Sequence, residues 1–502
     1  MALARHRFCS YSVFSYTHPE SLTSNAQLTQ NNLYQPNQSV TKLIKQMSFQ
    51  AHHDLSSFVT LLHGSIKMHW LNMQSWKNVI FEKGKTPSIS VGCTSSIGWK
   101  KKKNIPEVTI FVPQLRVPVR SDELQKILRS VVPTDVVDKV SCLRNQIILV
   151  AEDTGGSAIP ELQQALEEYL SLLVGVTRKE ECGILKLVEF KWKNLTDGRQ
   201  EVCVQSWWFE VFSVIHMMAT LTLTEANSML ISKDRSTSSD RIVSSDSMRN
   251  AVELLLKAAG YLELLIHDVL VHLPPDIRSR LPKDLHEGTL EAISLQALAQ
   301  GTEMQLGLAV ESQNATLSVK RRLACEQLSY LGQAHYCLST SNNSQGYGKK
   351  HMLFIKWKYL EAKAAAYYYN GLMLDKGTEP ASHISAVCCF LAAEDLLAES
   401  KKTCLSFCLA VPVTRPPPLW GAMKNLNKKI PEIASRKSQM YGYLMEQDKG
   451  LQILPDLPEF QLSLKPEDYH LPEPNWNTEN LEINRQTPSE QLVNNEDDTE
   501  IK

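Results

Sequence analysis

Residues 250–272 read NAVELLLKAAGYLELLIHDVLVH, and this stretch decides the fold class. Its apolar side chains recur every three or four residues, which is the spacing of one face of an α-helix. The stripe consists of Val252, Leu255, Leu256, Ala259, Leu262, Ile266 and Val269, and it covers about six turns. We therefore predict a long helix that buries one face.

The same periodicity continues on both sides of this helix. Towards the N-terminus, Pro160 suits a first helical position and is followed by a stripe from Leu162 to Leu173. Towards the C-terminus, helices are predicted at 288–311, 315–338, 351–375, 382–409 and 418–447. Long consecutive helices with short breaks predict antiparallel hairpins stacked side by side, although the sequence shows no clean 34-residue repeat.

Two runs break the helical pattern. Residues 108–112 and residues 185–192 are rich in β-branched, aromatic and aliphatic side chains. Pro113 and Pro118 limit the first run to an edge or an end of a sheet. The sequence thus predicts a mostly α-helical fold with a small sheet of two or three strands near its N-terminal part.

Both ends of the 502-residue chain lack the apolar period. Residues 1–104 are expected to be a disordered or poorly packed leader, and a transit peptide remains an alternative because the first 19 residues lack acidic side chains. Residues 105–455 are expected to form one folded unit. Residues 456–502 hold twelve acidic and three basic side chains, so we expect an acidic disordered tail.

Charge and cysteine usage exclude several functional classes. The formal net charge is -1, so we expect no global attraction to nucleic acid. The cysteines lack the spacing of a zinc site or a secreted disulfide framework, which favours a reducing cytosolic compartment. No run of apolar residues is long enough to predict a membrane span.

The common catalytic motifs are absent from the sequence. It contains no P-loop, no dinucleotide glycine fingerprint, no nucleophile elbow and no His-Glu-x-x-His helix. Cys404 and Cys408 share a helix face, but no partner pair with metal-ligand spacing lies near them. We expect no catalytic residue, no metal, no cofactor and no small-molecule substrate.

Several segments, taken in order, resemble the Bro-domain (Alix-like) family. They are Phe190-Lys191-Trp192, Trp208-Phe209-Glu210, Ala251 to Leu262, Asp284-Leu285, Leu298-Ala299-Gln300, Leu323-Ala324 with Gln327, Trp357 to Ala362, and Lys429-Ile430-Pro431. No single motif is specific, but their order and spacing extend over about residues 105 to 455. The likeness is closest to the stand-alone Brox-type members of the family.

The resemblance implies a curved, tetratricopeptide-like helical solenoid and a non-enzymatic adaptor of endosomal sorting. Such domains bind the C-terminal amphipathic helix of an ESCRT-III subunit. The implied location is the cytoplasm, with peripheral association at endosomes and contact with anionic membrane. The alternative is a generic helical-repeat scaffold that binds a different peptide, and a third possibility is an enzyme with an unfamiliar helical site.

The resemblance also implies a partner-binding face. Family residues that grip the partner helix are an aromatic side chain on the Leu-Ala-Gln helix and two aliphatic side chains on the next helix. The aliphatic positions fall on Val319 and Leu323, whereas the aromatic position is Gln305, with Leu306 beside it. Val319 and Leu323 share a helix face, and burial in the core is the alternative to partner binding.

A lipid anchor is an option only for a shorter product, and the alternative is a chance match of these residues in a solvated loop. Gly92 and Cys93 would form a myristoylation signal with an adjacent palmitoylation cysteine if a chain began just before residue 92. In the full sequence Val91 precedes them, so this glycine is internal. The C-terminal residues contain no prenylation cysteine.

Overall fold

The computed structural model describes residues 105–121, 123–129, 132–177, 188–196, 198, 201–231, 243–340, 346–415, 417–447 and 453–474. Within them, the helices are α2 (Glu123–Leu128), α3 (Thr134–Thr154), α4 (Ile159–Thr177), α5 (Trp207–Leu230), α6 (Ser245–Leu264), α7 (Pro275–Arg280), α8 (Glu287–Glu311), α9 (Leu317–Thr340), α10 (Gly346–Leu374), α11 (Pro380–Leu409) and α12 (Gly421–Gln447). The strands are β1 (Arg116–Pro118), β2 (Phe190–Asn194) and β3 (Val202–Val204). The predicted mostly α-helical fold with a small sheet is confirmed.

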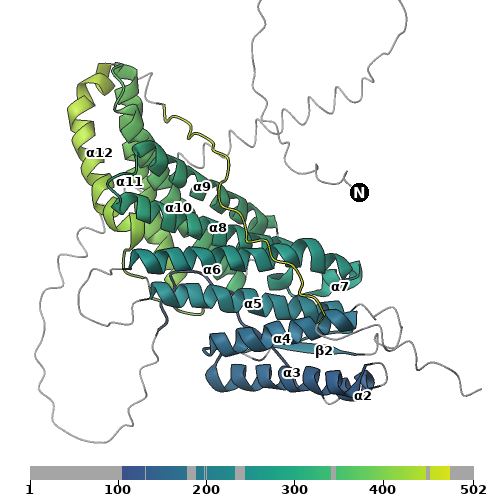
Figure 1. The fold of residues 1–502 in the computed structure, drawn as a ribbon. Helices are drawn as coiled ribbons and strands as arrows, with labels where there is room; N and C mark the ends of the chain where they lie inside the picture. Colours follow the sequence, from purple (N-terminus) through teal and green to yellow (C-terminus); the bar gives the residue numbers. More distant parts are fainter. Residues whose placement is uncertain are drawn as a thin grey trace, which may run out of the picture. The chain divides into compact units, whose positions relative to one another are not determined.

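The long helices pack in the order of the chain. Each of α3, α4, α5, α6, α8, α9, α10 and α11 contacts the next long helix, and α12 also returns to α8 (Figure 1). One buried cluster runs from the sheet through α3 to α8 into α9 and α10. A second cluster lies among α9, α10, α11 and α12. This nearest-neighbour packing is the arrangement that the helical periodicity predicts.

The sheet is antiparallel in the order β1-β2-β3, so β2 lies in the middle. The second predicted run is confirmed in its described part, because β2 begins at Phe190. The prediction of a strand at 108–112 is wrong, since the first strand begins at Arg116. The N–H groups of Thr109 and Ile110 donate to Asn227 Oδ1 at 2.9 and 2.8 Å, so a side chain of α5 takes the place of a neighbouring strand.

A buried network joins the sheet to α3, α4 and α5. The Glu210 carboxylate is fully buried and accepts hydrogen bonds from Arg144 Nε at 3.0 Å, Tyr169 Oη at 2.9 Å and Trp192 Nε1 at 2.6 Å. Arg144 Nη1 also donates to the carbonyl oxygen of Val119 at 2.5 Å. Each charge therefore has a partner of opposite sign and further hydrogen bonds, which a buried ion pair requires.

The helix predicted for residues 250–272 changes its hydrogen-bond spacing near its end. The α-helical part is α6, which gives way to a π-helical turn at Leu265–Val269 and a 3-10 turn at Leu270–His272. Ile266 and Val269 are nevertheless buried as the stripe predicts. The periodicity thus identifies the buried face correctly but does not reveal the π-helical turn.

α11 meets the length and composition that a membrane-crossing helix needs. In the fold it packs against α10 and α12, and Ile384, Val387 and Phe390 are buried. A core helix of this length passes the same test, so the finding is weak evidence for a membrane span.

The C-terminal segment 453–474 lies on the helices. Figure 1 shows it as a thin yellow trace without helix or strand that crosses them after α12. Tyr330 Oη of α9 donates to the carbonyl oxygen of Leu464 at 2.6 Å, and the N–H of Glu467 donates to the carbonyl oxygen of Leu256 in α6 at 3.0 Å. The predicted end of the folded unit at residue 455 is therefore too early. We call residues 453–474 the strap.

Candidate functional site

The predicted partner-binding face lies on the α8–α9 hairpin. A five-residue connection joins the two helices, which pack closely against each other. Val319 is 45% exposed, and Leu323, one turn later on α9, is half-buried against the second core cluster. The structure therefore places both aliphatic side chains on one stripe, with Val319 open to solvent.

The two α8 positions differ in accessibility. Gln305 is half-buried, whereas Leu306 is only 1% exposed and belongs to the second core cluster. A side chain with so little surface cannot contact a docked helix unless the core opens. The prediction that Leu306 contacts the partner is therefore wrong. This leucine packs beneath the face.

The strap borders this face, which the sequence reasoning missed. Leu457 and Phe460 pack against the same core cluster as Leu323. The guanidinium of Arg321 lies 5.9 Å from the ring centre of Phe460. Apolar side chains recur at 457, 460, 462, 464, 469 and 471, and they pack against the core. This recurrence is the sequence signal for an ordered segment, although the acidic composition of the tail favours disorder.

A buried carboxylate fastens the strap to α9. Glu326 is fully buried in its side chain and accepts from Arg322 Nε at 2.6 Å. Its other oxygen accepts from the N–H of Ser463 at 3.1 Å and from Ser463 Oγ at 2.5 Å. Because an ionised acceptor strengthens each bond, this contact fixes the position of the strap beside the candidate face.

Basic side chains lie within the same turn of α9. Lys320, Arg321 and Arg322 occupy the three positions between Val319 and Leu323. Arg321 also donates to Asn370 Oδ1 at 3.3 Å. A helix with an apolar stripe and acidic flanks would complement this combination of aliphatic and basic groups.

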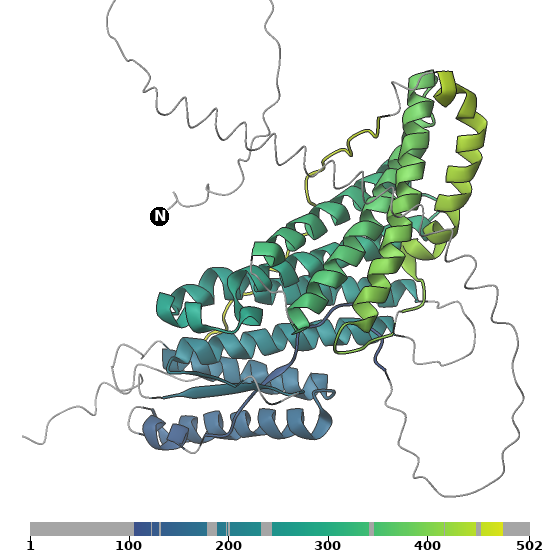
Figure 2. The ribbon, with the colours of Figure 1, turned by 180° about the vertical axis from the view of Figure 1, so that it is seen from behind.

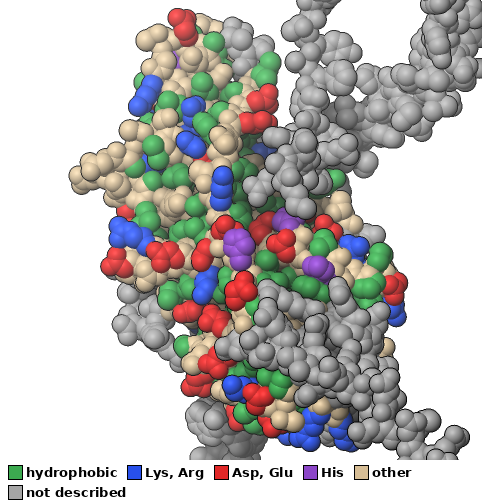
Figure 3. Space-filling view, turned by 45° about the vertical axis from the view of Figure 1, so that its right-hand side comes forward, with side chains coloured by type: hydrophobic (Ala, Val, Ile, Leu, Met, Phe, Trp, Pro, Cys, Tyr) green, Lys and Arg blue, Asp and Glu red, His purple; other side chains and the backbone are tan. Residues whose placement is uncertain are grey.

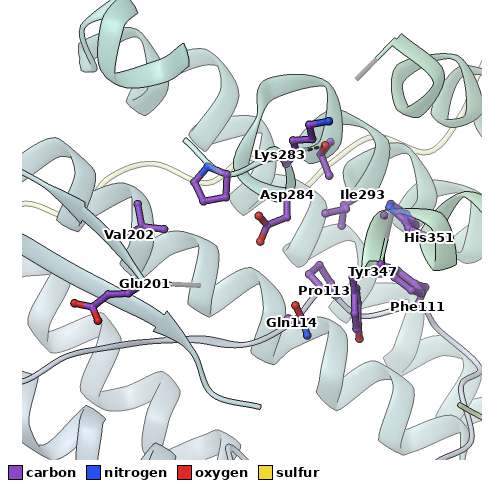
Figure 4. Close-up of a pocket in the computed structure, with 14 residues that line it drawn as sticks. Phe111, Pro113, Gln114, Glu201, Val202, Lys283, Asp284, Ile293, Tyr347 and His351 are labelled. Atoms are coloured by element: carbon purple, nitrogen blue, oxygen red, sulfur yellow. Dashed lines mark hydrogen bonds between the residues drawn. The ribbon is translucent and has the colours of Figure 1, made fainter. Parts of the chain in front are cut away.

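A separate cavity of about 660 Å³ lies where β3, the start of α8 and the start of α10 meet. Figure 4 shows Asp284, Gln114 and Tyr347 around it, from three different segments of the chain. The Asp284 carboxylate is held by Arg116 through contacts of 2.8 to 3.1 Å. Asp284 thus serves an ion pair, while Glu201, the other acidic side chain that lines the cavity, is exposed to solvent.

The histidine of the cavity is also engaged. The His351 ring stacks on Phe111 with a centroid distance of 4.5 Å, and its Nε2–H donates to Gln296 Oε1 at 2.7 Å. Burial lowers the pKa of His351 to about 3, and burial lowers the pKa of His216 on α5 to about 4. Both rings are neutral near pH 7, so His351 is not poised as a proton-transfer group there.

These two histidines predict a loss of stability in acid. Each pKa is lower in the folded chain than in the unfolded chain, so the unfolded state binds more protons as the pH falls below about 6.5. Above that pH the two histidines do not lower the free energy of unfolding. At pH 5 the protonation of each ring in the unfolded state should lower the free energy of unfolding by about 2 kcal/mol. Urea unfolding at a series of pH values measures this slope.

The variant His351→Gln separates this effect from that of the carboxylates. Glutamine keeps a donor for Gln296 but does not titrate, so the loss between pH 7 and pH 5 should shrink by about 2 kcal/mol. His335→Gln, at an exposed position of α9, is the matched control for the exchange of histidine for glutamine itself. An unaltered slope in His351→Gln would contradict the assignment.

The surface in Figure 3 carries hydrophobic, acidic and basic side chains side by side. The face in this view therefore shows no extended area of one charge. Among the described residues no group of three or more His, Cys, Asp or Glu side chains is placed to hold a metal ion. The leader 1–104, with Gly92 and Cys93, and the tail from residue 475 lie outside the described residues.

Comparison with known proteins relates the chain to one family. The family model described as BRO1-like domain matches residues 122–436. No curated protein is similar enough in sequence to match. The match includes α8 and α9, the two helices of the candidate face.

Two solved structures share the fold. The crystal structure of ALIX in complex with the SIVmac239 PYKEVTEDL late domain is similar over 72% of this chain, with a TM-score of 0.53 and 17% identity. This chain covers 49% of that ALIX chain, about half its length. The ALIX BRO1 CHMP4C complex is similar over 72% of this chain and 96% of the other, with a TM-score of 0.51 and 15% identity.

Proposed function

The chain belongs to the BRO1-like domain family, and on that premise we propose that it is a non-enzymatic adaptor of endosomal sorting. It captures the amphipathic C-terminal helix of an ESCRT-III subunit on the α8–α9 face. A solved relative in fold is a complex of the ALIX BRO1 domain with CHMP4C, which supports a protein partner of this kind. The adaptor acts in the cytoplasm and associates peripherally with endosomes.

The exposed position of Val319 above Leu323 is the observation that carries this proposal. A core helix buries its aliphatic side chains, but Val319 in the first turn of α9 is 45% exposed, and the buried residues of this helix begin only at Ala324. Two aliphatic side chains four residues apart match the spacing of an apolar stripe on a docked helix. Lys320 adds a basic charge that favours an acidic partner.

Gln305 distinguishes this face from the family pattern. An aromatic anchor commonly supplies much of the binding energy of a protein interface, and glutamine replaces it here. We therefore propose a weaker grip on the partner helix than the family pattern implies, with Val319, Leu323 and the neighbouring Phe460 of the strap as the apolar contacts.

The test replaces the aliphatic side chains by charges. Val319→Asp and Leu323→Asp should each weaken capture of ESCRT-III C-terminal helix peptides at least about tenfold, because a carboxylate beneath an apolar stripe is costly to desolvate. Fluorescence polarisation with labelled peptides measures the affinity. Val271→Asp, at a 59% exposed valine in the 3-10 turn after α6, is the matched control and should bind normally.

A gain-of-function arm strengthens the test. Gln305→Phe restores an aromatic side chain at the family position and should tighten peptide binding several-fold. If the Asp variants of α9 bind as well as the parent, the α8–α9 face is not the site. If Leu323→Asp also melts far below the parent, this leucine is a core residue. The binding of Val319→Asp alone then decides whether the α8–α9 face is the site.

The second candidate is a helical-repeat scaffold for a different peptide. The nearest-neighbour packing of the helices favours a peptide-binding scaffold in either case. This alternative would be favoured by two results together. The chain binds none of the ESCRT-III peptides, and it binds a different peptide partner whose binding Val319→Asp abolishes. The ion pair of Asp284 and the stacked His351 support a role without catalysis, cofactor or small-molecule substrate.

A further inference from the structure

The end of α11 and the turn after it expose a group of aliphatic side chains. Leu405 is 60% exposed and Leu409, one turn later on the same helix face, is 66% exposed. In the turn, Val411 is 75% exposed and Val413 is 48% exposed. Isolated exposed leucines are ordinary, but soluble proteins rarely keep a contiguous aliphatic patch without a use.

A buried lysine holds this turn in place. Lys350 Nζ of α10 donates to the carbonyl oxygens of Phe407 at 3.0 Å, Ala410 at 2.9 Å and Pro412 at 2.6 Å, and to Thr414 Oγ1 at 3.1 Å. The lysine thereby satisfies carbonyl groups at the C-terminus of α11. The turn is fixed from inside, and its aliphatic side chains point outward.

The start of the described chain adjoins the same turn. The N–H of Arg415 donates to the carbonyl oxygen of Pro106 at 3.0 Å, and Glu107 pairs with Arg415 in an isolated parallel bridge. Ile105, next to Pro106, is 51% exposed. Figure 2 shows the loop at the end of α11 beside this first segment. A fifth aliphatic side chain therefore joins the patch.

Exposed basic side chains lie on α11 next to the exposed leucines and at the start of α10. Lys401 precedes Leu405 by one turn and shares its helix face, and Lys402 is its exposed neighbour. Lys349 is exposed beside Lys350, the residue that holds the turn. In the sequence, the lysine run 100–103 also comes directly before Asn104 and Ile105.

The nearby acidic side chains are already paired. Glu107 is 7% exposed in its side chain and lies 3.3 Å from Arg415. Glu399 lies 3.5 Å from Lys356. The exposed charge next to the aliphatic side chains is therefore mainly basic.

We propose that these residues form a membrane-contact edge: Ile105, Leu405, Leu409, Val411 and Val413 with Lys349, Lys401 and Lys402. Its partner is the surface of an anionic bilayer, and the inference rests on the peripheral membrane association of the proposed function. Lysines at such a surface are attracted by lipid phosphates and carboxylates, while aliphatic side chains enter the region between headgroups and acyl chains. A second copy fits less well, because a symmetric contact would bring the same lysines together.

The experiment is sedimentation with vesicles of phosphatidylcholine alone or with about one third phosphatidylserine. The purified full chain should bind the anionic vesicles and lose most of that binding in high salt. Leu409→Asp combined with Val411→Asp should reduce binding at least about tenfold, and Lys401→Glu combined with Lys402→Glu should do the same. Val271→Asp, exposed elsewhere on the surface, is the matched control and should bind as the parent does.

Two results would overturn the inference. The first is unchanged vesicle binding in both double variants. The second is a dimer of the parent chain that Val411→Asp dissociates while vesicle binding persists, which would assign the edge to self-association. Peptide capture is measured on the same variants and should be unaffected, so failure of the membrane-contact edge is distinguishable from failure of the α8–α9 face.

Discussion

Replacing Glu210 with alanine is expected to lower the free energy of unfolding by about 4 kcal/mol. Its carboxylate is fully buried, and its removal leaves the Arg144 guanidinium without its charge partner in a site that is 3% exposed. The hydroxyl of Tyr169 and the indole N–H of Trp192 lose their acceptor as well. Urea unfolding at pH 7, followed by circular dichroism, measures the change.

A double variant separates the ion pair from simple loss of packing. Arg144→Met with Glu210→Leu removes both charges together, so it should recover a large part of the loss seen in Glu210→Ala. Glu225→Ala, at a half-buried position of the same helix, is the control and should change stability by less than about 1 kcal/mol. A loss in Glu210→Ala no greater than in this control would refute the structural role of the network.

The network shows what an apolar period can and cannot predict. The stripes of α4 and α6 follow from the sequence because each depends on side chains within one helix. Glu210 sits in the apolar run of α5, and its partner Arg144 lies 66 positions earlier in the chain. A period carries no information about such distant pairs, so the buried ion pair could not be predicted.

The same reason explains the errors at residues 108–112 and at the C-terminus. Residues 108–112 are strand-forming residues, yet two of their N–H groups donate to Asn227. Two carbonyl oxygens of the same run accept hydrogen bonds from Gln296 and Gln300. The apolar alternation of the strap is confined to short stretches such as 460–464, and its order comes from contacts with the helices and from hydrogen bonds to α6 and α9. Both segments depend on side chains that belong to other elements.

The candidate face could be predicted only in part. Helical spacing places Val319 and Leu323 on one stripe, as the structure has them. Gln305 is assigned to the face only by the family pattern. Helical spacing alone does not reveal that the adjacent Leu306 is buried. Phe460 beside Arg321 could not be foreseen, since the two are brought together only by the path of the strap.

Replacing Glu326 with alanine is expected to release the strap from α9. The carboxylate is the acceptor for Arg322 and for both polar groups of Ser463, so about 3 kcal/mol of local stability should be lost. Hydrogen exchange at the N–H of Ser463 should accelerate about a hundredfold, since each 1.4 kcal/mol is a factor of ten in the population of the open state. Mass spectrometry of peptides that cover residues 453–474 measures it.

The extent of faster exchange decides whether the strap moves as one piece. The N–H of Glu467 donates to the carbonyl oxygen of Leu256 in α6 and does not touch Glu326. If the strap is one cooperative segment, exchange at Glu467 accelerates with that at Ser463, and peptide capture weakens because Phe460 leaves the candidate face. If Glu467 stays protected, the anchors on α6 and α9 act separately.

Glu311→Ala, at an exposed position of α8, is the control and should leave both sites protected. If exchange at Ser463 is unchanged in Glu326→Ala, the carboxylate does not hold the strap. The aliphatic contacts of Leu462 and Leu464 would then be what holds it.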